Sequence, residues 1–167
     1  MGVVGGTFYL TVAFSSMVLL RDLPDGVLLF LLPFVGSWVT DTFAYFTGRL
    51  IGRHKLAPAI SPKKTVEGSI GGIVFAVGAF AAFGAIAAAR GVAPRYPALL
   101  VCGLLVSVVS QIGDLALSAI KREQGIKDYG RLFPGHGGVL DRFDSVIATA
   151  PLILLFSLLE GGFTLFY

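Results

Sequence analysis

Charged residues are scarce in this sequence. Asp, Glu, Lys and Arg make up 14% of the 167 residues, whereas ordinary soluble domains carry about 25%. Hydrophobic residues account for 55%, and the mean hydropathy is +0.83. Because the apolar residues also form long stretches, the composition excludes an ordinary soluble domain and predicts an integral membrane protein.

Cysteine and several catalytic motifs are scarce or absent as well. The single cysteine, Cys102, lies in an apolar run, so it forms no intrachain disulfide and we interpret it as a small buried hydrophobe. No GxxxxGK[ST] segment occurs, which excludes the phosphate-binding loop of many soluble nucleotide-binding enzymes. No Ser-His-Asp or Cys-His arrangement is visible. No basic segment precedes the first apolar stretch, so we expect no cleaved signal peptide.

Five stretches are apolar and long enough to cross a bilayer, which takes roughly 20 residues. The predicted spans are Met1–Leu20, Val27–Gly48, Gly68–Ala89, Pro97–Ala119 and Val146–Leu165. The sequence therefore predicts an all-α fold, a polytopic bundle of about five transmembrane helices forming a single domain over residues 1–167. The third span contains small residues that permit close helix contact, namely Gly68, Gly72, Gly78 and Gly84.

Two long polar loops, Arg49–Glu67 and Lys121–Asp144, separate the predicted helices. Because two spans lie between them, both loops are expected on the same face of the membrane. They hold ten of the 13 lysines and arginines, so the positive-inside rule predicts that this face is cytoplasmic. The remaining three, in short linkers on the opposite face, are Arg21, Arg90 and Arg95.

Two acids, Asp41 and Asp114, lie within the apolar spans. A carboxylate there costs a few kcal/mol, so it needs a partner or a water-filled cavity. One interpretation is hydrogen bonding between helices; the other is a functional site, which we favour for Asp114 and leave open for Asp41. A transporter lined by these acids is disfavoured, because transport sites lie near the midplane and the polar groups here gather at one face.

The second polar loop ends in two further acids, Asp141 and Asp144. If a helix begins near Val139, their spacing puts both carboxylates on one face of its first turn, where they repel unless a cation lies between them. Hard oxygen ligands of this kind favour magnesium. The alternative is favourable placement of acids at a helix N-terminus, which does not explain the cations and glycines just before them.

The polar loops also contain groups suited to phosphate. Ser61–Gly68 (SPKKTVEG) combines a rigid turn, two lysines and hydroxyls at a helix start, as a phosphate-binding turn does. In the second loop, Gly135, Gly137 and Gly138 allow backbone amides to approach an anion, and His136 could donate to a phosphate or act as an acid. Nearby cations are Lys121, Arg122, Lys127 and Arg131.

Other cations have a simpler interpretation. Arg49, Arg53 and Lys55 are well explained by contact with anionic lipid or by an effect on topology. The residues alone therefore indicate a membrane protein with a cytoplasm-facing site for phosphate groups and a divalent metal. A site at the membrane surface suggests a lipid phosphate as substrate, together with a soluble phosphorylated partner. The reaction type stays open at this point.

Four segments resemble the phosphatidate cytidylyltransferase, or CDP-diacylglycerol synthase, family. The most specific reads SAIKR, then KD, then PGHGGVLDRFD, within Ser118–Asp144. The others are DTFAYFTGR at Asp41–Arg49, SPKKTVEG at Ser61–Gly68 and QIGD at Gln111–Asp114. Members of this family are usually longer, with further membrane helices before this region, so the chain resembles their C-terminal catalytic part.

The resemblance implies that CTP and phosphatidate give CDP-diacylglycerol and pyrophosphate, with Mg²⁺, as one ion or two. It implies metal ligation by Asp114, Asp141 and Asp144. The further residues implied in catalysis are Lys121, Arg122, Lys127, Asp128 and His136. Those implied in substrate binding are Ser61, Lys63, Lys64, Thr65, Glu67 and Arg142. We expect a multi-pass protein of a bacterial inner membrane with no nucleic-acid partner, and homodimerisation is a family expectation.

The nearest alternative is a related CTP-dependent membrane enzyme. It would be a cytidylyltransferase for another lipid phosphate, or a polyprenol or phytol kinase acting on a lipid alcohol. The DGxxAR…GxxxD…D pattern of the CDP-alcohol phosphotransferases is absent.

Overall fold

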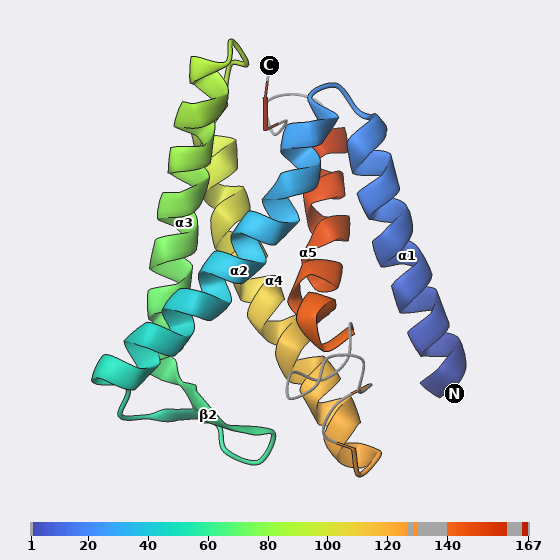
Figure 1. Ribbon diagram of the computed structural model, residues 1–167, viewed down its shortest axis with the longest axis vertical. Helices are drawn as coiled ribbons and strands as arrows, with labels where there is room; N and C mark the ends of the chain where they lie inside the picture. Colours follow the sequence, from blue (N-terminus) through green and yellow to red (C-terminus); the bar gives the residue numbers. More distant parts are fainter. Residues whose placement is uncertain (1, 127–128, 130–139, 160–164, 167) are drawn as a thin grey trace.

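The computed structural model describes residues 2–126, 129, 140–159 and 165–166 as a bundle of helices with one small hairpin (Figure 1). The helices are α1 (Gly2–Asp22), α2 (Gly26–Ile51), α3 (Val66–Ala89), α4 (Tyr96–Glu123) and α5 (Leu140–Leu158). Four of them, α1 to α4, are long and apolar enough to cross a membrane. The all-α membrane fold is therefore confirmed, although the apolar part of the fifth helix, Phe143–Leu158, is shorter than a full span.

The first polar loop contains regular structure that hydropathy did not indicate. Strands β1 (Lys55–Ala57) and β2 (Ser61–Thr65) pair antiparallel, with Lys55 opposite Thr65 and Ala57 opposite Ser61. The hairpin leads directly into α3, where Thr65 acts as the N-cap and its hydroxyl accepts the Gly68 N–H at 3.1 Å. This cap satisfies one of the free donors at the helix start, which explains why the strand ends and the helix begins there.

The last helix differs most from its predicted boundaries. It begins at Leu140 rather than Val146 and ends at Leu158 rather than Leu165. A hydropathy window misses its charged first turn, although an acid such as Asp141 is favourable there because the helix dipole is positive at the N-terminus. Leu165 is instead buried beyond the helix, where its carbonyl accepts the Arg95 N–H at 3.0 Å.

Close contact between α2 and α3 depends on glycines of α3. A Cβ at Gly68 would lie 2.5 Å from the Ala44 carbonyl oxygen, and one at Gly72 would lie 2.9 Å from the Thr40 carbonyl oxygen. Neither position has room for a larger residue without separating the helices. The predicted close helix contact is confirmed here and at Gly84, whereas a Cβ at Gly78 would meet no atom within 4 Å among the described residues.

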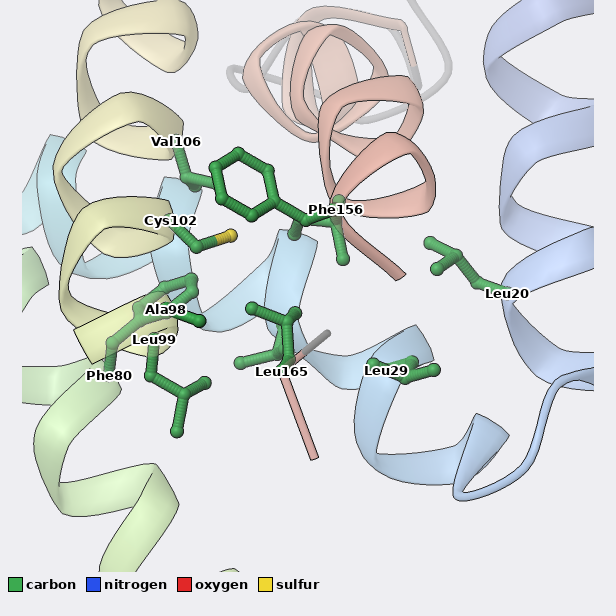
Figure 2. Packing of buried hydrophobic residues seen from close by; sticks show 11 residues of the cluster. Leu20, Leu29, Phe80, Ala98, Leu99, Cys102, Val106, Phe156 and Leu165 are labelled. Carbon is green, nitrogen blue, oxygen red and sulfur yellow. The ribbon is translucent and has the colours of Figure 1, made fainter. Parts of the chain in front are cut away.

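The hydrophobic core lies between all five helices and includes Leu20, Phe80 and Leu99 (Figure 2). Cys102 is fully buried in this cluster, as its apolar surroundings predicted. Hydroxyl contacts add polar links between the helices, among them one from Thr40 Oγ1 to Ser107 Oγ at 2.9 Å. The packed bundle brings the hairpin and the C-terminal end of α4 to the same end of the molecule (Figure 1).

Candidate active site

Three carboxylates from three different helices lie near one another at the polar end of the bundle. Asp41 of α2, Asp114 of α4 and Asp144 of α5 are near enough for their charges to interact. Ser145 connects two of them, because its hydroxyl donates to Asp41 Oδ2 at 3.2 Å and its N–H donates to Asp144 Oδ1 at 2.8 Å. Asp144 is only 8% exposed, so its negative charge is largely shielded from water.

The hairpin reaches this acidic group through Lys64. Its ammonium forms an ion pair with Asp114, whose other carboxylate oxygen accepts the Ser118 hydroxyl at 3.3 Å. Both side chains of the ion pair are about a quarter exposed, at 26% and 24%. The hairpin of the first polar loop thus contacts Asp114 of α4, which precedes the second polar loop in the chain. That the two polar loops form one site stays a prediction.

Asp141 is already bound within the protein. Its carboxylate lies 2.8 Å from Lys121 Nζ and also accepts the Tyr129 N–H at 2.9 Å. Tyr129 in turn donates its hydroxyl to the Leu117 carbonyl at 3.2 Å, and Lys121 lies 5.3 Å from the centre of its ring. Burial raises the pKa of the Tyr129 phenol, an effect that the nearby Lys121 opposes. These contacts attach Tyr129 and the C-terminal part of α4 to the start of α5.

The predicted metal ligands do not form a complete protein site. Among the residues that the structure describes, no group of three or more His, Cys, Asp and Glu is arranged to hold a metal ion. Carboxylate oxygens are nevertheless the donors that Mg²⁺ prefers, and this ion usually keeps several waters and shares substrate phosphates. Asp144 fits that pattern as a partial ligand. Asp114 and Asp141 each pair with a lysine, but the Asp114 side chain is 24% exposed and the Asp141 side chain 9%, so Asp114 is the more accessible of the two to an ion.

A cavity of about 480 Å³ lies beside the acids, between α2, the hairpin and α3. Its wall includes the predicted substrate-binding residues Ser61, Lys63, Lys64 and Thr65. It also includes residues that sequence reasoning did not assign to a substrate: Asp41, Tyr45, Arg49, Lys55 and Gln111. A signal for three of them was present, because Asp41, Tyr45 and Arg49 recur every four residues and so share one face of α2.

Glu67, also predicted to bind substrate, is engaged with the chain between α2 and β1. Its Oε2 accepts the backbone N–H groups of Arg53 and His54 at 3.1 and 3.2 Å. Its Oε1 lies 2.6 Å from Nδ1 of the His54 ring. The Val66 N–H donates to the His54 carbonyl at 2.9 Å, so this corner holds the hairpin against α3.

Part of the predicted site lies outside the described residues. This applies to Lys127, Asp128, His136 and the side chain of Arg142, and to the glycines around His136. Arg122 is described and is exposed near the end of α4. The described portion of the site thus consists of an acidic group, two lysine–aspartate pairs and a cation-lined cavity.

Known proteins resemble this chain over most of its length. Residues 2–159 match the model of a family described as the cytidylyltransferase family. A phosphatidate cytidylyltransferase of Brucella abortus biovar 1 (strain 9-941) is 49% identical over 152 residues, covering 90% of this chain and 55% of the relative. The protein of that name from Bacillus subtilis (strain 168) is 42% identical over 154 residues, covering 89% and 56%. The chain thus spans little more than half the length of these relatives.

Proposed function

Because the chain belongs to the cytidylyltransferase family, we propose that it forms the catalytic part of a phosphatidate cytidylyltransferase. CTP and phosphatidate would give CDP-diacylglycerol and pyrophosphate. The observation that carries the proposal is the Lys64–Asp114 pair, which joins a cation-lined cavity to an acidic group at one end of an apolar helix bundle. Cations for phosphate oxygens and acids for a metal are thus adjacent, as phosphoryl chemistry needs.

In the proposed reaction, an oxygen of the lipid phosphate attacks the α-phosphorus of CTP. A new phosphorus–oxygen bond forms, the bond to the bridging oxygen of the β-phosphate breaks, and its electron pair leaves with pyrophosphate. No covalent nucleophile of the protein is needed, so alignment and charge neutralisation supply most of the catalysis. Lys63 and Lys64 would hold phosphate oxygens in the cavity, and Lys121 and Arg122 would neutralise the leaving group.

Asp114 and Asp144 would hold Mg²⁺, with waters and substrate phosphates completing its shell. When bound, the ion would supply positive charge that neutralises phosphate oxygens. The positive-inside rule supports a cytoplasmic location for the two polar loops, since their sequences contain ten of the 13 lysines and arginines. The four apolar helices and the bacterial relatives together support a location in a bacterial membrane.

The test is transfer of label from α-labelled CTP into chloroform-soluble product, with purified protein, phosphatidate and magnesium. Label should require phosphatidate, and Asp144→Asn should lower the rate by about a hundredfold or more, the scale expected for losing one electrostatic contact in a transition state. Asp22→Asn, at the opposite end of the bundle, is the matched control. Consumption of a lipid alcohol instead of phosphatidate would indicate a kinase. If the chain alone gives no label, the assay is repeated with the part of a relative that this chain does not cover supplied.

A further inference from the structure

The cavity beside α2 has an unusual charge balance. Four cations line it, Arg49, Lys55, Lys63 and Lys64, against one acid, Asp41. Lys64 is paired with Asp114, but within the described part of the chain no ion pair involves the other three cations. Arg49 donates a neutral hydrogen bond, from Nη1 to the Tyr45 hydroxyl at 2.9 Å. The cavity is therefore suited to an anion with more than one negative charge.

We propose that this cavity binds the phosphate group of the lipid substrate, with Arg49 and Lys55 as residues that distinguish it from the nucleotide. The inference rests on the proposed function and assigns one substrate to one part of the site. A phosphate monoester carries between one and two negative charges near neutral pH and has three acceptor oxygens. Arginine suits such an anion because its planar fork matches phosphate geometry, and lysine adds a point charge.

The surroundings of the cavity favour a lipid over a nucleotide. It lies against α2 and α3, both apolar enough to span a membrane. Phe46, Leu50 and Ile70 each follow a lining residue directly in sequence, and each is more than half exposed. Exposed apolar side chains on membrane helices contact acyl chains, while the long cations at the helix ends extend to the headgroup level. A lipid could thus place its phosphate in the cavity and its chains along these helices.

The position relative to the acids agrees with this assignment. Asp41 lines the cavity and interacts electrostatically with Asp114 and Asp144. A lipid phosphate in the cavity would therefore have an oxygen near the proposed magnesium ligands. Lys121 and Arg122 lie at the end of α4 and do not line the cavity. In this assignment they would bind the triphosphate of CTP. The two substrates would then approach the acids from different sides, as an in-line displacement requires.

The experiment measures binding without turnover. Dioctanoyl phosphatidate, dioctanoylglycerol, inorganic phosphate and CTP are each titrated into the detergent-purified chain, and into Arg49→Gln, Lys55→Gln and the double variant. Arg53→Gln is the matched control, because Arg53 is an exposed cation of the same segment that does not line the cavity. The double variant should bind phosphatidate about tenfold or more weakly, with CTP affinity changed by less than about twofold. Arg53→Gln should change neither affinity.

Four results would overturn the inference. A loss of CTP affinity with phosphatidate unaffected would assign the cavity to the nucleotide. Equal losses for phosphatidate and dioctanoylglycerol would mean that acyl chains, and not the phosphate, are recognised. Unchanged affinities, or no phosphatidate binding by the parent chain, would leave Arg49 and Lys55 as cations that contact the bilayer surface. A parent chain that binds phosphatidate but transfers no cytidylyl group, even with the remaining part of a relative supplied, would contradict the proposed function and not this site.

Discussion

Asp141 and Asp144 show how two similar residues acquire different surroundings. Their spacing puts them on one turn of α5, and from sequence both looked equally able to bind a metal. In the structure Asp141 pairs with Lys121 at 2.8 Å, and the two side chains are 9% and 11% exposed. Asp144 has no ion pair among the described residues and lies within the acidic group. Asp141 is thus suited to hold Lys121 in place, and Asp144 to contact a cation.

The first prediction separates these two roles. Asp141→Asn leaves the Lys121 charge buried without its partner, so it should lower the free energy of unfolding by about 3–5 kcal/mol. The double variant Lys121→Met, Asp141→Leu removes both charges and should recover most of that loss. Denaturant unfolding in detergent measures the difference. If Asp141→Asn unfolds like the parent while cytidylyl transfer is lost, Asp141 acts on substrate or metal and not on Lys121.

At the scale of elements, the hairpin depends on Glu67, which accepts hydrogen bonds from the chain between α2 and β1. Glu67→Ala should loosen the hairpin and so raise the KM for phosphatidate more than it lowers kcat. Glu67→Gln keeps an oxygen acceptor and should retain most of the parent's KM. A pure loss of kcat in both variants, with KM unchanged, would indicate that Glu67 contacts the reacting groups directly.

The contact between α2 and α3 provides a second element-scale prediction. Gly72→Ala would place a Cβ 2.9 Å from the Thr40 carbonyl oxygen, and overpacking of this kind costs about 1–3 kcal/mol. Gly78→Ala is the matched control, because it has open space and should gain up to about 1 kcal/mol in helix propensity. Thermal unfolding of the two variants in detergent should show opposite shifts. Equal shifts would mean that α2 and α3 do not pack through Gly72.

At the scale of the whole molecule, the bundle predicts which ends share a compartment. In a Cys102→Ala background, Ala59→Cys lies in the hairpin, Gln124→Cys follows α4 and Val92→Cys lies at the opposite end (Figure 1). In intact cells, an impermeant maleimide should label Val92→Cys and spare the other two, because the hairpin end is expected in the cytoplasm. Labelling of Ala59→Cys and Gln124→Cys, with Val92→Cys spared, would mean that the protein has the opposite orientation in the membrane. Opposite accessibility of Ala59→Cys and Gln124→Cys would contradict the bundle.

The sequence by itself determined the membrane class and the four long helices. It could do so because the length of an apolar stretch is a local property of the sequence, and that length decides whether a helix can cross a bilayer. The start of α5 was not predicted correctly, because the first turn of this helix is charged and hydropathy does not reveal it. The hairpin was missed for a related reason, since Lys55–Thr65 has too few apolar residues to show a strand pattern.

Only the tertiary structure decided which charges meet. Lys64 pairs with Asp114, Lys121 pairs with Asp141, and Arg49 joins Lys55 in one cavity wall. These choices depend on how α2, α4 and α5 pack and on where the hairpin folds. Coulomb energies depend on distances of a few ångströms between residues far apart in the chain, which spacing along the sequence does not specify.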